Sequence, residues 1–481
     1  MLSNYVSAQD VARGLANWEQ RSGPKYIRLA EALIRFLALH NFAAGTRLPS
    51  ERALTAEIDA SRGTVIRAYG HLTQSGYIDR KRNSGTVVAR SHLVTRRIRQ
   101  SRWESLDKVL EQTPQEHLLY IGAPYIDETL RGISITLEDL RSSFIPPHGI
   151  ASSGLFELRR LIAQRTSSSW RETSTDEVLI TSGTHSGLAL IFDLLAQPSM
   201  KVIVEAPTYP AILELAVNTG VKILPVSCDG DGPIPGKFEE AAQLGDIAFA
   251  YLMPTAHHPT GRIMSFQRRR RLLEICQRHQ IPIVEDLANA ELVFSNDDVP
   301  PSLYELSDGG GVIALGSFSK TLWSGFHVGW AVSDGDTILM LNRQRMVREL
   351  HGGILEQLVV LQLAPRIEEI LLERRELLRV SFEQAADFLA TNLPDWELSK
   401  SRGGYNLWIR LPSGSGDDFA ATAARRGILI EAGSSYGAEG QFQDFIRLAL
   451  GMPVDSLYRA LLALEEAWQV YKQKLDGTQS R

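Results

Sequence analysis

The sequence lacks the features of a disulfide-rich or membrane-spanning protein. It contains only two cysteines in 481 residues, Cys228 and Cys276. Two distant thiols provide neither a disulfide framework nor the ligand spacing of a metal site. No apolar run reaches the ~20 residues that cross a bilayer, and the polar N-terminal stretch lacks the apolar centre of a signal peptide. We therefore expect a protein of the reducing cytoplasm.

Acidic residues are scarce in one part of the chain. Between Pro24 and Ile98 there are 13 Lys or Arg against 5 Asp or Glu, so this segment carries +8 within a total of −5. Such asymmetry is typical of a basic module that binds a polyanion. The length of 481 residues predicts two or three domains, and an apolar fraction of 44% is sufficient for a sizeable core.

The basic segment has the pattern of three short helices followed by a hairpin. Apolar residues recur at helical spacing within residues 25–40, Ser50 precedes a second helical stretch, and Ser61 precedes a third. Residues 76–88 have the pattern of two short strands around a basic turn. This order predicts a winged helix-turn-helix, whose second helix enters the major groove of DNA. A small helical domain with a solvated basic face is the alternative.

Two motifs in this module, Leu48-Pro-Ser-Glu-Arg52 and Ser61-Arg-Gly-Thr-Val65, resemble the GntR-type winged helix. The resemblance implies a DNA-binding domain over residues 1–90. The residues that it assigns to DNA are Arg52, Ser61, Arg62, Thr64, Arg67 and Gly85, with Asn83 and Ser84 beside them in the wing. Ile66 stands where relatives often carry a basic residue, and Arg67 is its neighbour. Which of the two residues faces DNA therefore stays open. Residues 91–115 are polar, without an apolar stripe, and are expected to be a linker.

Three segments of the remaining chain carry candidate chemistry. In the first, Ile313–Trp330, a buried apolar run is followed by a turn of small residues that contains Lys320. Partial desolvation in such a turn lowers the pKa of a lysine and frees its amine to attack a carbonyl. Ser317 can direct its hydroxyl toward an anion in the same turn. A surface lysine in a Ser/Gly loop is the alternative for this segment alone.

The other two segments place polar residues at the ends of strands. Residues 281–286 are expected to be a buried strand that ends in Asp286, an acid that can pair with a protonated pyridine nitrogen. Residues 178–191 have the pattern of a strand, a glycine turn and an amphipathic helix, and the start of a helix offers free amides to a phosphate. Strands that alternate with helices predict an α/β domain with a mainly parallel sheet.

In this order the three segments resemble the fold-type I aminotransferases, which use pyridoxal phosphate. The resemblance covers roughly residues 116–470 and implies an aminotransferase class I/II-like domain over residues 116–475, with a small C-terminal α+β subdomain. It implies that Lys320 forms the Schiff base and that Asp286 pairs with the pyridine nitrogen. The residues that it assigns to the phosphate are Gly183, Thr184, His185 and Ser317.

Two further positions match this family and three depart from it. The resemblance implies that Tyr209 stacks on the cofactor ring and that Arg447 binds the carboxylate of an effector. His258 stands where the family has an asparagine on the phenolic oxygen, Ala288 where it has a tyrosine, and His327 where it has an arginine on the phosphate. An imidazole is only partly charged near neutrality, so a weaker phosphate grip is expected. We expect His258 to replace the missing phenolic-oxygen partners in part; an ordinary polar loop is the alternative.

Short apolar runs predict the remaining elements. Leu118–Pro124 is expected to be the first strand of the domain, and a long charged helix is expected from about Glu368. Further strands are expected at residues 201–205, 221–226, 247–253 and 404–411 and around Arg447.

A GntR-like winged helix joined to an aminotransferase-like domain is the arrangement of the MocR family of transcriptional regulators. The resemblance implies a cytoplasmic homodimer that binds an operator in double-stranded DNA and senses an amino compound through pyridoxal phosphate on Lys320. One alternative is an active aminotransferase with a DNA-binding appendage. The other is a regulator that has lost the cofactor and binds another ligand. The effector, the operator and the direction of control do not follow from the sequence.

Overall fold

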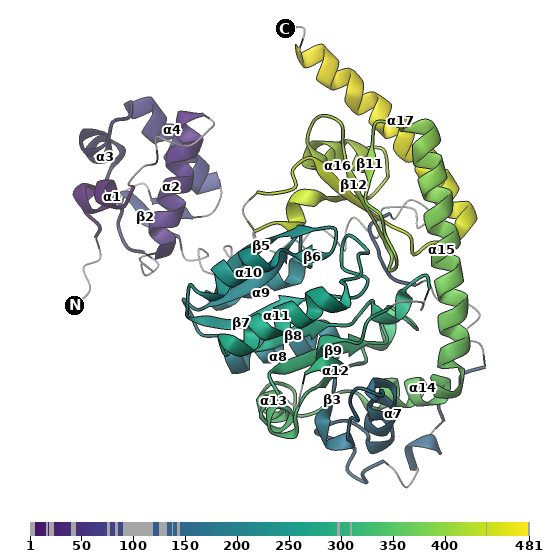
Figure 1. Ribbon diagram of the computed structural model, residues 1–481. Coiled ribbons are helices and arrows are strands. Elements are labelled where there is room, and N and C mark those ends of the chain that lie inside the picture. The colour runs from purple at the N-terminus through teal and green to yellow at the C-terminus, as the bar shows by residue number, and fades with distance from the viewer. Residues whose placement is uncertain are drawn as a thin grey trace. The chain divides into compact units, whose positions relative to one another are not determined.

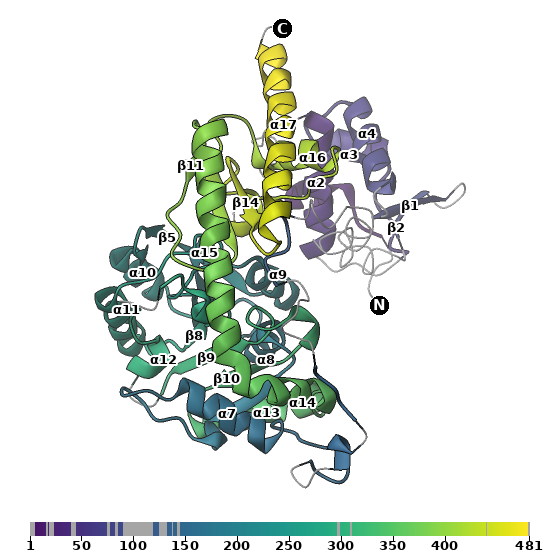
Figure 2. The ribbon, with the colours of Figure 1, turned by 90° about the vertical axis from the view of Figure 1, so that its right-hand side faces the viewer.

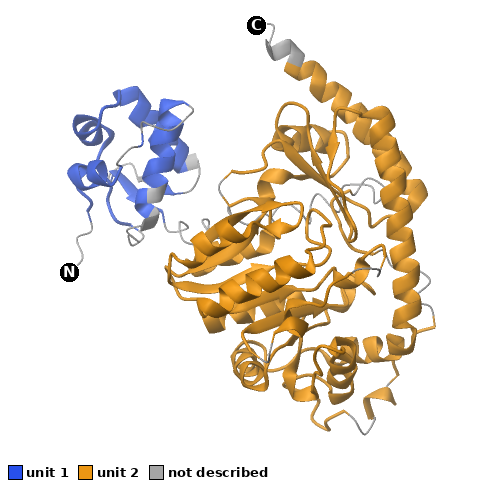
Figure 3. Cartoon of the chain, in the orientation of Figure 1, with its two compact units in different colours: residues 1–111 blue, residues 112–481 orange. Residues whose placement is uncertain are grey.

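The computed structural model describes most of the chain (Figure 1). The described residues are 5–15, 18, 24–39, 45–74, 77–81, 85–89, 119–124, 132–136, 138–141, 145–295, 299–307, 310–438 and 440–479. The chain divides into two compact units, Met1–Glu111 and Gln112–Arg481, which Figure 3 colours blue and orange. The expected linker, residues 91–115, lies outside the described residues, as do Asn83 and Ser84 of the wing.

The N-terminal unit consists of short helices and a two-stranded antiparallel hairpin. Its elements are α1 (Ala8–Gly14), α2 (Lys25–Leu39), α3 (Glu51–Glu57), α4 (Arg62–Gln74), β1 (Ile78–Lys81) and β2 (Gly85–Val88). The apolar faces of the helices meet in one core, in which Leu29, Leu54 and Tyr69 are fully buried. The predicted winged helix-turn-helix is confirmed.

Helices α3 and α4 begin at the two predicted serine caps. The hydroxyl oxygen of Ser50 accepts from the amide of Ala53 at 3.2 Å, and that of Ser61 accepts from the amide of Thr64 at 3.2 Å. These side chains satisfy amides that have no partner inside the helix. The sequence therefore determines where both helices of the helix-turn-helix motif start.

The C-terminal unit is built around a mixed sheet. Among the described residues this sheet has eight strands in the order β3-β10-β9-β8-β7-β4-β5-β6. Their bounds are β3 (Val178–Thr181), β10 (Gly329–Val332), β9 (Val312–Ser317), β8 (Ile283–Asp286), β7 (Ile247–Leu252), β4 (Lys201–Ala206), β5 (Lys222–Asp229) and β6 (Gly232–Pro233). The strands from β9 to β5 pair in parallel, whereas β10 is antiparallel to both its neighbours. The prediction of a mainly parallel sheet is confirmed.

Helices cover both faces of this sheet (Figure 1). One face packs against α8 (Thr184–Leu195), α9 (Pro210–Thr219) and α13 (Gly335–Arg348). The other packs against α7 (Phe156–Thr166), α10 (Pro235–Ala242), α11 (Phe266–Arg278) and α12 (Leu303–Leu306). Successive side chains of a strand point to opposite faces, so Tyr251 joins the first core and Leu252 the second. This double burial explains why the strands are apolar throughout.

The end of the chain forms a smaller antiparallel sheet with its own helices. The strand order is β11-β12-β14-β13, with β11 (Glu397–Leu398), β12 (Asn406–Arg410), β14 (Phe445–Ala449) and β13 (Glu431–Ala432). The chain reaches it through α14 (Ile354–Leu363) and the long α15 (Ile367–Asn392), which packs along α17 (Val454–Gln479) (Figure 2); α16 (Gly416–Ala424) completes the set. The long helix and the strands predicted here are confirmed. No described helix is both long enough and apolar enough to cross a membrane.

One predicted strand is wrong. The described part of Leu118–Pro124 is turn and coil, outside both sheets. Its carbonyl oxygens do not pair along a single neighbouring strand. That of Leu119 accepts from the backbone amide of Ala449 in β14 at 2.8 Å, that of Tyr120 accepts from Arg447 at 2.6 Å, and that of Gly122 accepts from the amine of Lys320. An apolar run that looks like a strand therefore serves as a wall beside two cationic side chains.

Candidate functional site

A cavity of about 220 Å³ lies at the carboxyl ends of the central strands, where β8 and β9 meet the turn that precedes α8. Its lining residues are Ser182, Gly183, Thr184, His185, Tyr209, Met253, His258, Asp286, Ala288, Asn289, Ser317, Ser319, Lys320 and His327. Every residue that the sequence assigned to the cofactor is among them. The carboxyl ends of strands are where open α/β sheets bind ligands.

Lys320 follows β9 and directs its amine into this region. Burial lowers the pKa of Lys320 to about 8; the positive charge of Arg447 lowers it as well, and Asp286 opposes the shift. The amine donates to the carbonyl of Gly122, and the hydroxyl of Tyr405 donates to the backbone carbonyl of Lys320 at 2.7 Å. A lysine with such a pKa has an appreciable neutral fraction near pH 8, and the neutral amine is the form that attacks a carbonyl.

Asp286 ends β8 and is 3% exposed. Its Oδ2 accepts from the hydroxyl of Tyr251 at 2.6 Å, and its Oδ1 accepts from the amide of Ala288 at 2.8 Å. Burial raises the pKa of Asp286, while these two hydrogen bonds lower it by favouring the carboxylate. Tyr251 was missed by the sequence analysis. The sequence feature that could have indicated it is a tyrosine inside the otherwise apolar strand β7.

Glu285, the acidic residue that precedes Asp286 in β8, points to the opposite face of the sheet. It is fully buried and accepts from the amides of Leu303 at 2.8 Å and Tyr304 at 2.9 Å at the start of α12. Burial raises the pKa of Glu285 to about 7 against these hydrogen bonds. It therefore supports the fold, and Asp286 alone of the pair reaches the cavity.

The start of α8 offers an anion site in the same cavity. Gly183 precedes the helix with a φ of +92°, a conformation that favours glycine. The first amides of a helix lack intrahelical partners and carry its positive dipole end. Among the described residues, the buried hydroxyl of Thr184 has no hydrogen-bond partner, and Ser317 lies across from Gly183. A phosphate would satisfy this hydroxyl and these amides together.

His258 is held between aromatic rings. Its Nδ1 accepts from the side-chain amide nitrogen of Asn406 at 2.8 Å. Its ring lies edge-on to Tyr209, with centroids 5.5 Å apart, and 5.5 Å from the ring of Tyr436. The neighbouring His257 points away and is 1% exposed, and burial lowers its pKa well below the ordinary range. Only His258 of the two histidines is therefore available to a ligand in the cavity.

The two remaining predicted histidines line the solvent-exposed side of the cavity. Partial desolvation by the surrounding protein lowers the pKa of His185, and the negative charge of Glu214 opposes the shift. His327 adopts the left-handed conformation, with a φ of +49°. Imidazole at these positions binds an anion less strongly than a guanidinium, which is charged at every physiological pH.

Arg447 is engaged by other protein groups. Strands β13 and β14 place Glu431 directly opposite Arg447, and Nη2 of Arg447 forms an ion pair with Oε2 of Glu431. Its Nε donates to the hydroxyl of Tyr436 at 2.9 Å, and its Nη1 donates to the carbonyl of Tyr120 at 2.6 Å. All three guanidinium nitrogens therefore have protein acceptors. Glu431 was missed by the sequence analysis, although an acid within the apolar run Ile428–Ala432 was a signal.

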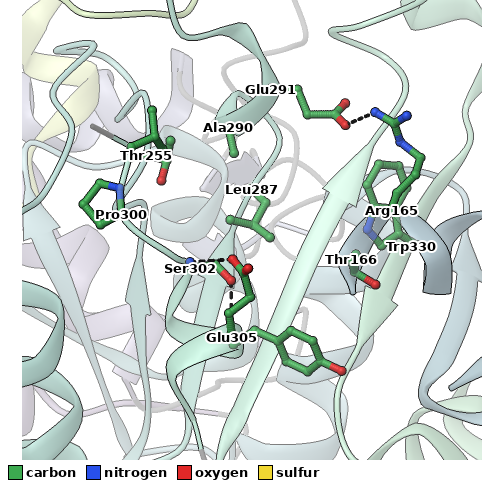
Figure 4. A pocket seen from close by; sticks show the side chains of 12 residues that line it. Arg165, Thr166, Thr255, Leu287, Ala290, Glu291, Pro300, Ser302, Glu305 and Trp330 are labelled. Atoms are coloured by element: carbon green, nitrogen blue, oxygen red, sulfur yellow. Dashed lines mark hydrogen bonds and ion pairs between the residues drawn. The ribbon is translucent and has the colours of Figure 1, made fainter. Parts of the chain in front are cut away.

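Figure 4 shows a second cavity, of about 190 Å³. Residues of the segment 287–291 line both cavities. The lining residues of the second cavity are Arg165, Thr166, Thr255, Leu287, Ala290, Glu291, Val299, Pro300, Ser302, Tyr304, Glu305 and Trp330. Glu291 forms an ion pair with Arg165 and accepts from the hydroxyl of Thr321 at 3.2 Å. Because Thr321 follows Lys320 directly, this segment anchors the turn that carries the lysine.

The residues assigned to DNA lie at the surface of the N-terminal unit, with one exception. Those that are exposed are Arg52, Ser61, Arg62, Arg67 and Gly85. Thr64 is 7% exposed, and its hydroxyl lies 2.9 Å from that of Ser61, so its burial favours a role in starting α4. Ile66 is 42% exposed and Arg67 is exposed as well, so exposure does not show which of the two faces DNA. The guanidinium of Arg67 lies over the ring of Tyr26, 5.4 Å from its centroid.

Comparison with known families matches both parts of the chain. Residues 146–464 match "Aminotransferase class I and II", and residues 25–88 match "Bacterial regulatory proteins, gntR family". YdfD of Bacillus subtilis, an uncharacterized HTH-type transcriptional regulator, is 26% identical over 450 residues, which cover 89% of this chain and 92% of that protein. The 2-aminoadipate transaminase of Thermus thermophilus is 30% identical over 308 residues, covering 62% of this chain and 75% of that enzyme.

Solved structures agree with the second match. The crystal structure of LysN, an α-aminoadipate aminotransferase from Thermus thermophilus, superposes with a TM-score of 0.69 and 25% identity, covering 78% of this chain and 95% of LysN. That enzyme is complexed with N-(5'-phosphopyridoxyl)-L-leucine. A kynurenine aminotransferase of Pyrococcus horikoshii superposes with the same TM-score at 24% identity, covering 77% of this chain and 96% of that enzyme.

Proposed function

The chain belongs to the aminotransferase class I and II family, and we propose that it is a MocR-type transcriptional regulator whose binding to DNA responds to an amine. Its GntR-type domain and aminotransferase-like domain occur in the order found in regulators that align over nearly their full length. The observation that carries the proposal is the single cavity that joins Lys320, Asp286 and the start of α8 in a chain with a DNA-binding domain.

Pyridoxal phosphate is the cofactor that the family implies, and the residues of the cavity fit it. When bound, it supplies an aldehyde carbon that bonds to amines and a ring that takes up electrons. Lys320 would provide the amine, Asp286 the carboxylate for the ring nitrogen, and Tyr209 a stacking surface. The hydroxyl of Thr184, which has no hydrogen-bond partner in the part of the chain that the structure describes, supports the assignment of the phosphate to the start of α8.

The proposed response rests on what happens to Lys320. An amine effector would compete with Lys320 for the cofactor, and a Lys320 amine that does not hold the cofactor would donate to the carbonyl of Gly122, as it does in this structure. The turn that carries the lysine is tied through Thr321 to Glu291. A change at the lysine would thus reach the surrounding wall. The effector shifts the regulator between two states only to the extent that it binds one of them better.

The other half of the proposal concerns DNA. Arg52 near the start of α3 and Arg62 and Arg67 on α4 are exposed positive charges, which suit a phosphate backbone. Fold-type I aminotransferases are typically dimers, and we infer a homodimer whose two winged helices contact paired half-sites. The cytoplasm is the expected compartment because the partner is DNA.

The test combines a spectrum with a DNA-binding assay. Purified protein and its Lys320→Ala variant are mixed with pyridoxal phosphate, and visible absorption is recorded. We expect a band of protein-bound cofactor in the wild type that is absent from the variant, and amines that change the band should also change the retention of genomic operator fragments. If Lys320→Ala retains the same band, or if amines change the band without any effect on DNA, the proposal is wrong.

A catalytic activity is the second candidate, favoured by the lowered pKa of Lys320 and by the 30% identity to a transaminase. The three departures from the family pattern at His258, Ala288 and His327 are expected to slow turnover. A multiple-turnover assay with an amino donor and an oxo-acid measures this directly. Less than one turnover per site would favour the regulator, and sustained turnover would favour the enzyme.

A further inference from the structure

The expected carboxylate-binding arginine of this site is already paired within the protein. Arg447 and Glu431 are each 4% exposed and form an ion pair across β13 and β14. The hydroxyl of Tyr436, which is fully buried, donates to Glu431 at 2.5 Å and accepts from Arg447 at 2.9 Å. These three side chains form one hydrogen-bonded network, which we call the Arg447 cluster.

The Arg447 cluster borders the cavity that contains Lys320. The ring of Tyr436 lies 5.5 Å from the ring of His258, which lines that cavity. Gly122 lies close to both Lys320 and Arg447. Its carbonyl accepts from the amine of Lys320, and a Cβ atom added to this glycine would lie 4.0 Å from Nη1 of Arg447. A ligand held at Lys320 would therefore have the cluster as a neighbour.

Three of the five N–H donors of Arg447 have protein acceptors, and Glu431 already neutralises its charge, so a ligand carboxylate beside Arg447 must either displace Glu431 or lie next to its negative charge. The displaced Glu431 would keep its negative charge in a buried position after losing its cation, and breaking a buried ion pair from one side is strongly unfavourable. A ligand that brings no carboxylate leaves the pair intact. We propose that the amine recognised by this site carries no carboxylate and that Glu431 sets this specificity. The inference rests on the proposed function, because it concerns the amine that exchanges with Lys320.

A second contact beside the cluster supports a neutral ligand group. Asn406 is 3% exposed, and its amide nitrogen donates to His258. Among the described residues its carbonyl oxygen has no hydrogen-bond partner, and a Cβ at Gly122 would lie 3.3 Å from it. This oxygen suits a hydroxyl or amine hydrogen and repels a carboxylate. The chemical class expected is thus a primary amine whose other polar group, where it has one, is a neutral hydrogen-bond donor.

The first experiment uses pairs of compounds that differ only by a carboxylate: alanine and ethylamine, leucine and 3-methylbutylamine, lysine and 1,5-diaminopentane. For each compound we measure the concentration that gives half of the maximal change in the absorption band of the bound cofactor. In the wild type, we expect the amine of a responding pair to act at a concentration at least about tenfold below that of its amino acid. Equal or better responses to the amino acids would overturn the inference.

The second experiment removes the charge of Glu431. Glu431→Gln keeps the shape of the side chain and frees Arg447, so amino acids should act at least about tenfold more readily while amines change little. Glu397→Gln is the matched control, because Glu397 also stands opposite an arginine, Arg410, in the same sheet but is exposed. An unchanged preference in Glu431→Gln would remove the assigned role of this residue.

Propionate tests directly whether a simple carboxylate binds near Arg447. This test needs neither the cofactor nor a ligand side chain that fits the cavity. Thermal unfolding is measured with propionate and with chloride at equal ionic strength. We expect propionate to stabilise Glu431→Gln and not the wild type. Stabilisation of the wild type alone, or of neither protein, would contradict the inference. If no cofactor band forms in the wild type, the proposed function fails, and the propionate measurement still decides whether Glu431 excludes carboxylates. If Glu431→Gln does not fold, the wild-type preference between paired compounds decides.

Discussion

Tyr251 donates its hydroxyl hydrogen to Oδ2 of Asp286 at 2.6 Å, and both side chains are buried. The parallel register pairs Tyr251 with Val284, so Asp286 lies two residues further along the neighbouring strand and on the same face. Burial raises the pKa of Asp286, and this hydrogen bond opposes the shift. The charged form is the one that pairs with a pyridinium. By favouring the carboxylate of Asp286, Tyr251 therefore supports the proposed contact of Asp286 with the cofactor.

Replacing Tyr251 by phenylalanine should therefore weaken binding of pyridoxal phosphate. A hydrogen bond to a charged group contributes about 1.5–3 kcal/mol, which corresponds to a tenfold to hundredfold loss of affinity. Titration of the cofactor band measures it. Tyr304→Phe is a suitable control because the hydroxyl of Tyr304 lies near Thr173, away from this cavity. A change below twofold in Tyr251→Phe would show that Asp286 does not depend on this tyrosine.

The rate at which Lys320 captures the cofactor should depend on pH. The pKa of this lysine is lowered to about 8, and only the neutral amine reacts. Below pH 8 the neutral fraction falls about tenfold per pH unit, so the rate should fall likewise; above pH 9 it should level off. Stopped-flow absorption between pH 6 and pH 10 follows this. A rate that still climbs steeply from pH 9 to pH 10 would indicate an ordinary lysine.

Two threonines near Gly183 should respond in opposite ways to replacement by valine. Thr184→Val removes a buried hydroxyl that has no partner among the described residues, so it should leave the stability of the cofactor-free protein unchanged or slightly higher. It should also lower cofactor affinity at least about tenfold if that hydroxyl binds the phosphate. Thr181→Val removes a bond to the carbonyl of Gly183 at 3.0 Å and should cost about 1 kcal/mol of stability. Chemical denaturation and cofactor titration separate the two effects.

Binding to DNA should depend on the exposed arginines of the N-terminal unit. Arg62→Ala removes a positive charge at the start of α4, so it should weaken binding and reduce the slope of affinity against salt by about one. Arg13→Ala on α1, where the arginine pairs loosely with Asp10 at 3.9 Å, should change binding little. Fluorescence anisotropy with labelled operator DNA measures both. An unchanged salt slope in Arg62→Ala would exclude a phosphate contact.

Thr64→Val tests whether Thr64 stabilises the start of α4 or contacts DNA. The hydroxyl of Thr64 lies 2.9 Å from that of Ser61 and is shielded from solvent. We expect a loss of stability of about 1 kcal/mol with little effect on the intrinsic affinity for DNA. Thermal unfolding and anisotropy distinguish the outcomes. A large loss of DNA affinity at unchanged stability would favour direct contact instead.

The elements of both units could be predicted because their signals are local. Ser50 and Ser61 cap their helices through the neighbouring amides, and the apolar run before Ser317 needs only its own residues to indicate a buried strand. The predicted strand at Leu118–Pro124 failed for the opposite reason. Two of its carbonyl oxygens bond to Lys320 and Arg447, which lie about 200 and more than 300 residues away in the chain.

The sequence by itself determined the two-domain order, the start of both helices of the helix-turn-helix motif, and the set of candidate cofactor residues that line one cavity. Each of these lies within a short segment of recognisable chemistry. Only the tertiary structure decided which groups those residues face. Strand register brings Tyr251 to Asp286 and Glu431 to Arg447, and register depends on how distant strands align. The charge state of Asp286 and the occupation of Arg447 follow from those neighbours, since burial and hydrogen bonding set them together.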